Sequence, residues 1–308
     1  MTQSLLAHPG GTFAPSRPRA LLRAVAVVSC LPYLGLKVAW LSGSEAGIPE
    51  GSSLLEHRGA VAVANGVTVL MDACVIVLAL VLTRPWGMRV PAWLLAAPVW
   101  VATGLLAPIM TGFPLQLLTG TTSDDSSSEP FLHDWVFSVV YGGFIVQGLA
   151  LGTLFALYAR DRWGHLWQGR IWELPRSCLG PSQRTGAVTA AVVAVVPLTL
   201  QLRSAFGGEV LRAMDALFLL AAVGGALILA FGRAPVLPVR VPLALVWVGS
   251  GAAACWGAWM SLASLVVDEH SAGRHLTYSG QMITGALVAA VGLRFLARRS
   301  AALPRHRA

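Results

Sequence analysis

The stretch TGAVTAAVVAVVPLTLQLRSA, from Thr185 to Ala205, is apolar over most of its length and holds a single charged residue, Arg203, near its end. A helix needs about 20 such residues to cross the hydrocarbon core of a bilayer. Comparable apolar runs cover roughly 20–42, 62–83, 90–110, 135–159, 213–232, 241–265 and 277–297. Lipid offers no hydrogen bonds, so the backbone N–H and C=O groups of a spanning segment must bond to one another, as they do in an α-helix. These runs therefore predict an all-α, polytopic integral membrane bundle of eight transmembrane helices.

The overall composition agrees with a lipid environment. Hydrophobic residues make up 56% of the chain and charged residues only 12%, against about 25% charged residues in a soluble domain. A net charge of +8 could indicate nucleic-acid binding, but the basic residues lie in short loops between apolar runs instead of forming one patch. The expected partner is therefore the lipid bilayer and not nucleic acid. The first run resembles a signal peptide, but its length and Lys37 favour an uncleaved helix.

The loops on alternate sides of the predicted helices differ in charge, which predicts their orientation. Glutamate and aspartate dominate one side, whereas most of the 22 lysine and arginine residues lie on the other. Arginine-rich loops stay in the cytoplasm, so both termini are predicted to be cytoplasmic and the protein to lie in the plasma membrane. The basic residues of that side are Arg17, Arg19, Arg23, Arg84, Arg89, Arg160, Arg162, Arg170, Arg176, Arg184, Arg233, Arg240, Arg294, Arg298, Arg299, Arg305 and Arg307.

A Trp/Arg-rich cytoplasmic linker, 160–184, divides the chain into two four-helix halves, 20–159 and 185–297. Residues 1–19 and 298–308 are then cytoplasmic tails, and the linker is expected to form a short interfacial helix. The halves share a spacing pattern, because His133, Tyr141, Gly143 and Gly148 recur as His270, Tyr278, Gly280 and Gly285. An even number of helices in each half makes this a parallel repeat, which is a known transporter plan.

Lys37 is the only lysine in the chain, and it lies near the outer end of the first helix. It can reach the headgroups by snorkelling, or it can pair with Asp72, which lies well inside the second helix. Arg203 and Asp215 flank an outer turn of the second half and could pair in the same way. Such pairs can fix helix register or act as a proton or cation switch, because a buried lysine can lose its proton.

Histidines next to acids mark the predicted outer mouth. They are His133 with Asp134 and His270 with Glu269, and Tyr141 and Tyr278 lie one or two turns below them. The alternatives are ordinary loop histidines with interfacial tyrosines, a divalent metal site or a proton path. The sequence does not identify a metal, and we expect no bound cofactor, since no histidine lies mid-membrane. Neither GxSxG, HExxH nor a P-loop occurs.

The stretch PYLGLKVAW, from Pro32 to Trp40, is followed by a Gly/Ser-rich turn. It resembles the opening of uncharacterised multi-pass membrane proteins of GC-rich bacteria, and this resemblance implies no activity.

Three functions stay open. The favoured one is outward-facing binding or transport of a small molecule or ion, with Lys37, Asp72, Arg203 and Asp215 as its polar interior. The others are a membrane-embedded enzyme acting on a lipid or isoprenoid, and a non-catalytic accessory or immunity protein.

Overall fold

The computed structural model describes residues 17–50, 52, 58–120, 132–266 and 272–302, and these form helices and turns with one isolated β-bridge, Arg170–Pro238. Eight helical segments in this part are long and apolar enough to cross a membrane, which confirms the predicted number of spans. The α-helices are α1 (Arg17–Val28), α2 (Leu31–Leu41), α4 (Arg58–Val81), α5 (Ala92–Thr119), α6 (Asp134–Trp163), α7 (Pro181–Phe206), α8 (Val210–Phe231), α9 (Arg240–Gly251), α10 (Gly257–Val266) and α11 (Ala272–Ala302).

Two of the eight spans are interrupted. The first consists of α1 and α2, which meet at Ser29 and Cys30, and Pro32 stands in the first turn of α2. Proline suits the first turn of a helix because it has no N–H to donate. The seventh span consists of α9 and α10, which are joined by a π-helical turn over Ala252–Trp256. A π-turn accommodates one residue more than an α-turn, and such turns are frequent at functional sites.

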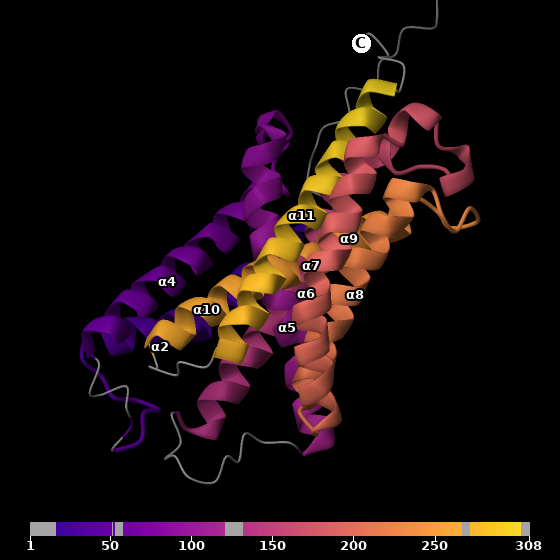
Figure 1. Ribbon diagram of the computed structural model, residues 1–308. Helices are drawn as coiled ribbons and strands as arrows, with labels where there is room; N and C mark the ends of the chain where they lie inside the picture. The colour runs from indigo at the N-terminus through magenta and orange to yellow at the C-terminus, as the bar shows by residue number, and fades with distance from the viewer. Residues whose placement is uncertain (1–16, 51, 53–57, 121–131, 267–271, 303–308) are drawn as a thin grey trace, which may run out of the picture.

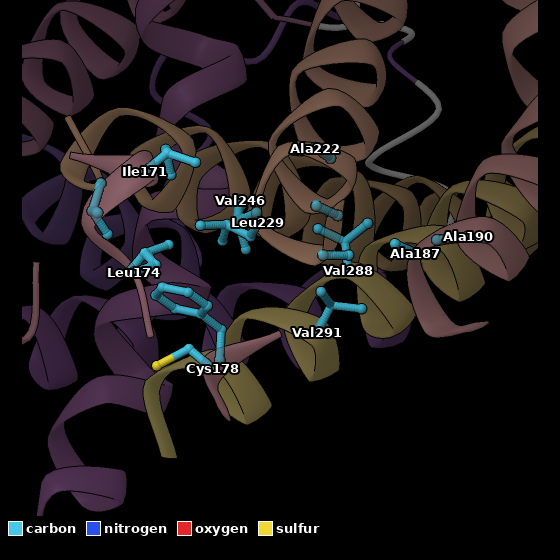
Figure 2. Packing of buried hydrophobic residues seen from close by; sticks show 14 residues of the cluster. Ile171, Leu174, Cys178, Ala187, Ala190, Ala222, Leu229, Val246, Val288 and Val291 are labelled. Atoms are coloured by element: carbon cyan, nitrogen blue, oxygen red, sulfur yellow. The ribbon is translucent and has the colours of Figure 1, made fainter. Parts of the chain in front are cut away.

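The second half has a tightly packed core formed by α7, α8, α9 and α11. Figure 2 shows part of this cluster, including Leu229, Val246 and Val288, which are fully or almost fully buried. Glycine lets the helices approach closely. A Cβ on Gly249 would lie 2.6 Å from the backbone nitrogen of Ala222 in α8. Small residues at helix contacts are the usual means of close packing in membranes.

The first half is packed less evenly. The C-terminal half of α4 joins a buried cluster with α1, α5 and α6 that includes Leu78 and Leu82. The N-terminal half of α4 leaves Val63 and Leu70 more than 60% exposed. Figure 1 shows α4 at the edge of the bundle, inclined away from α7, α8, α9 and α11. The exposed surface of α4 therefore lies toward its N-terminal end, and its C-terminal end is packed into the bundle.

The two halves meet where α5 crosses α9. Gly104 and Gly251 face one another, and a Cβ on Gly104 would lie 2.3 Å from the carbonyl oxygen of Gly251. Two indole N–H groups bridge the same junction: that of Trp100 donates to the Ser250 hydroxyl (3.0 Å), and that of Trp247 donates to the Thr103 hydroxyl (3.3 Å). The halves therefore form one bundle. Whether they arose by duplication stays a prediction.

Both ends of the described chain lie at the same end of the bundle, which we call the basic end (84–91, 160–180, 232–240, the start of α1 and the end of α11). Arg19 of α1 is ion-paired with Asp161, and Arg299 of α11 donates to the carbonyl of Gln168. Figure 1 shows the C-terminal end of α11 beside the folded 164–180 segment. The linker forms three short 3₁₀ turns in place of the expected interfacial helix, because the chain bridges back to the 232–240 loop at Arg170 and Pro238.

Candidate functional site

A cavity of about 740 Å³ lies beside the middle of α4, where residues between Thr68 and Leu78 line it. Side chains of α2, α4, α5 and α6 line it, together with Trp256, Trp259 and Met260 from the π-turn and α10. Its volume falls within the range of small-molecule sites. Most of the wall is aliphatic or aromatic, so the few polar groups in it decide what the cavity can bind.

Lys37 lies in this wall and is buried, with 9% of its surface exposed. Its ammonium group donates a hydrogen bond to Oδ1 of Asn65 on α4 at 2.7 Å. It also lies 4.7 Å from the ring centroid of Tyr33 and 4.8 Å from that of Trp40. These rings come from the preceding and following turns of α2, so one helical face places the charge between two aromatic rings. These contacts hold the Lys37 ammonium inside the bundle.

The polar face of α4 carries Asn65, Thr68 and Asp72, at helical spacings of three and four residues. Asp72 is only 4% exposed and lies in the cavity wall. Gln147 of α6 is its hydrogen-bonding neighbour, yet Oδ2 of Asp72 and Oε1 of Gln147 have no partner. Buried polar atoms are normally satisfied, so two free acceptors in one cavity wall indicate a position for a ligand group that donates hydrogen bonds.

The predicted ion pair between Lys37 and Asp72 is not formed. Both residues face the same cavity and interact through space, but no nitrogen–oxygen distance between them is within 4.0 Å. Asn65 lies two turns before Asp72 on the same face of α4, and it accepts the hydrogen bond of Lys37 instead of Asp72. Sequence reasoning missed Asn65 and Gln147, although a lone amide in an apolar helix is a visible signal.

Arg203 and Asp215 do not pair either, and neither lines this cavity. Asp215 of α8 contacts Arg212 at 3.6 Å, three residues earlier on its own helix. Arg203 is exposed at the end of α7 and lines a second pocket together with Tyr278. The four residues predicted as one polar interior thus lie in two separate regions, because α5 and α6 complete the first cavity without any contribution from α7 or α8.

The predicted outer mouth is only partly described. His133 and Asp134 are exposed at the start of α6, and the backbone N–H of His133 donates to the carbonyl of Gly47 at 3.0 Å. Glu269 and His270 lie outside the described residues, so the convergence of the two acid–histidine pairs stays a prediction. Within the described residues, no three His, Cys, Asp or Glu side chains cluster in a way that could hold a metal.

The tyrosines of the two halves occupy different surroundings. Tyr141 lines the first cavity, with its ring 5.0 Å from that of Phe113 and 5.8 Å from that of Phe137. Tyr278 is buried and accepts a hydrogen bond from Arg212 at 3.4 Å beside the second pocket. Tyr141 and Tyr278 thus line two different cavities.

Comparisons of the chain with protein-family models, with curated proteins and with solved structures find no match. The resemblance of Pro32–Trp40 to multi-pass membrane proteins of GC-rich bacteria stays a prediction. The structure itself combines a membrane-type helical bundle with a mostly apolar cavity that has a few buried polar side chains in its wall.

Proposed function

We propose that the protein binds a small amphiphilic molecule in the cavity beside α4, and that this binding serves transport across or within the plasma membrane. The observation that carries the proposal is the composition of the wall. An extensive apolar surface surrounds a few polar side chains in the cavity wall, Lys37, Asp72 and Gln147, which we call the polar cluster. Such a wall suits a molecule with an apolar body and a single polar head.

The polar cluster favours a particular kind of head. One lysine and one aspartate give the cluster no net formal charge, which favours a neutral or zwitterionic head over an ion. The free atoms Oδ2 of Asp72 and Oε1 of Gln147 are acceptors, so the head should donate hydrogen bonds. Hydroxyl, amide and amino groups meet both requirements.

The cavity borders the exposed surface of α4, which favours a ligand that partitions into lipid. Leu70 and Cys74 of α4 line the cavity and are also exposed on the surface of the helix, where the bilayer would contact them. A molecule dissolved in the membrane could therefore enter beside α4. The charge bias of the loops places the acidic end, opposite the basic end, on the outer face, and Lys37 lies two turns or less from that end of α2.

The alternatives make different demands on the structure. A purely accessory protein needs no cavity of this size, so the hollow beside α4 favours a binding role. An enzyme acting on a lipid or isoprenoid would use the same cavity but needs an acid–base pair beside it. His133 is exposed and does not line the cavity, whereas its neighbours Leu132 and Val136 do. Binding or transport is accordingly the function we propose first.

The test is thermal unfolding of the purified full chain in dodecyl maltoside, with two neutral probes of equal tail length. 1-Decanoylglycerol carries hydroxyl donors, and methyl decanoate carries none. We expect only the glyceride to raise the unfolding temperature, because a ligand that binds the folded state stabilises it by mass action. Asp72→Leu should lose this response but remain folded, since it replaces a buried carboxylate that has a free oxygen by an apolar group of similar size.

A filled cavity provides the second arm of the test. Ala102 lines the cavity, and Ala102→Trp should abolish the response to the glyceride by occupying its volume. Ala286→Trp is the matched control, because Ala286 is exposed on α11 and does not line the cavity. Equal responses to the two probes, or an unchanged response of Ala102→Trp, would show that the amphiphile binds elsewhere.

A further inference from the structure

A second pocket, of about 340 Å³, lies at the acidic end of the bundle and shares no lining residue with the first cavity. It is formed by the end of α7, the start of α8 and the start of α11. Polar side chains dominate its wall, in contrast to the first cavity, and none of the described lining residues is acidic. The side chains that matter here are Gln201, Arg203, Arg212, Arg274, Thr277 and Tyr278.

Most basic residues of the chain lie at the basic end, but the arginines of this pocket lie at the opposite end. Only Lys37, Arg58, Arg203, Arg212 and Arg274 lie outside the tails, loops and helix ends of the basic end. Three of these five line this one pocket, and they come from three different helices. Positive charge is disfavoured on the outer face of a membrane protein, so three arginines in the wall of one pocket indicate a common negatively charged ligand.

Arg212 is held in place before any ligand arrives. Its guanidinium lies 5.7 Å from the ring centroid of Tyr278 and donates to the hydroxyl of that residue. Asp215 and Glu209 contact it at 3.6 and 3.3 Å, but the Glu209 side chain is 61% exposed, where ion pairs are weak. A guanidinium fixed by an aromatic ring and a carboxylate loses little freedom when it binds an anion.

Gln201 supplies the observation that is hardest to explain without a ligand. It is 1% exposed, it lines the pocket, and neither Oε1 nor Nε2 of its amide has a partner. A buried amide with no hydrogen bond lowers the stability of the fold, and such groups are rare in native proteins. Both amide atoms are covered by the surrounding protein, so a ligand oxygen would satisfy Nε2 once the side chain turned toward the pocket that it lines.

We propose that this pocket binds a phosphate group, carried by an anionic lipid head or free in solution. Arg203 and Arg212 would contact its oxygens, and Gln201 would donate to it from below. Arg274 already has another interaction, so we assign it only the contribution of its charge. All three arginines lie within about one turn of a helix end, which is the depth of lipid phosphates.

The test uses the full chain in dodecyl maltoside and phosphate-free buffer, with thermal unfolding as the readout. The probes are sodium phosphate at constant ionic strength, and dioctanoyl phosphatidic acid compared with dioctanoylglycerol, which has the same tails without phosphate. Both lipids are added to the Ala102→Trp variant, in which the first cavity is filled. We expect the phosphate-bearing probe to stabilise the protein, and Arg203→Gln to weaken its affinity about tenfold or more. Arg294→Gln, an exposed arginine at the basic end, should respond like the parent.

Stabilisation by inorganic phosphate identifies a site for the free ion, and stabilisation by phosphatidic acid alone identifies a lipid-head site. No response to either probe, or equal losses in Arg203→Gln and Arg294→Gln, overturns the proposal. Gln201→Leu should be more stable than the parent without phosphate and should lose the phosphate response. If it keeps the full response, Gln201 has no role in binding. The response to decanoylglycerol reports on the first cavity, so the two proposals can fail independently.

Discussion

Lys37 shows how a single buried charge is accommodated in this bundle. Its ammonium is held by Asn65 and two aromatic rings, so the structure assigns the lysine a fixed position on α2 against α4. We expect a double-mutant cycle of Lys37→Met and Asn65→Leu to give a coupling free energy of about 1 to 2 kcal/mol. Each single substitution leaves the other polar side chain buried without its hydrogen-bond partner, whereas the double substitution removes both polar groups. Steric trapping in bicelles would measure the free energy of unfolding.

The control cycle combines Lys37→Met with Thr199→Val, because Thr199 lies on α7 and its hydroxyl bonds only to its own helix. Changes at distant sites add to within about 0.3 to 0.5 kcal/mol. A Lys37–Asn65 coupling no larger than this value would mean that the hydrogen bond contributes nothing to the packing of α2 on α4.

At the same scale, the sequence identifies the unusual residues but not their partners. Lys37 and Asp72 stand out as charges in apolar helices, and both do line the cavity. The ion pair between them, one of the two alternatives for Lys37, is not formed. Whether it forms depends on the rotation of α4, which apolar periodicity does not fix when the helix faces lipid on one side and a cavity on the other. The position of Gln147 beside Asp72 was missed because it depends on how α6 is rotated against α4, which the sequence does not show.

Among the elements, the crossing of α5 and α9 determines whether the halves stay together. Gly104→Ala would place a methyl group 2.3 Å from the Gly251 carbonyl oxygen, which is backbone and cannot rotate away. We expect this change to lower the stability by about 1 to 3 kcal/mol, as overpacking of a close contact does. A fall in the unfolding temperature in detergent, followed by tryptophan fluorescence, would detect it.

Gly142→Ala is the matched control, because a Cβ at this helical position of α6 meets no atom within 4 Å. It should be neutral or slightly stabilising, since alanine is the better helix former by about 1 kcal/mol. If the two variants unfold at the same temperature, the backbones of α5 and α9 are farther apart than described.

The π-turn at 252–256 makes a second prediction at this scale. Because the turn holds one extra residue, deleting Ala253 should convert it to α-helix and leave Trp256 and Trp259 facing the cavity. Deleting Ala244 from the regular part of α9 should instead rotate the rest of that span by about 100° and abolish folding. Size-exclusion profiles and unfolding temperatures of the two deletions distinguish these outcomes. Comparable damage in both would contradict the single-bulge interpretation.

The helix breaks themselves could not be predicted from apolar runs. Hydropathy averaged over about 20 residues shows where a span lies but not whether the backbone is continuous within it. The interruption at Ser29 and Cys30 precedes Pro32, a local signal that fits a helix start. The π-turn follows Gly249-Ser250-Gly251, where no single residue requires it. Its position instead coincides with the contact between Gly285 of α11 and Ala254, where a Cβ on the glycine would lie 2.6 Å from the alanine nitrogen.

Across the whole molecule, length and composition predicted the number of spans, and the alternation of loop charge predicted that both ends of the chain lie together. The structure confirms eight spans and places Arg19 and Arg299 at one end of the bundle. The hollow beside α4 could not be predicted, because the same apolar sequence suits a helix that faces lipid, a packed core or a cavity. The packing of the helices does not determine which side of the membrane the basic end faces.

We predict that the basic end is cytoplasmic, because arginine-rich loops resist export. A green fluorescent protein fused after Ala308 should fluoresce in a bacterial expression host, and alkaline phosphatase inserted after Gly208 should be active, since it folds only after export. Phosphatase inserted after Pro235, in the opposite loop, should be inactive and serves as the control. The reverse pattern would place Lys37 and the arginine pocket near the cytoplasm. Both proposed sites would then draw their ligands from the inner leaflet, and a phosphate bound beside Arg203 would come from the cell interior.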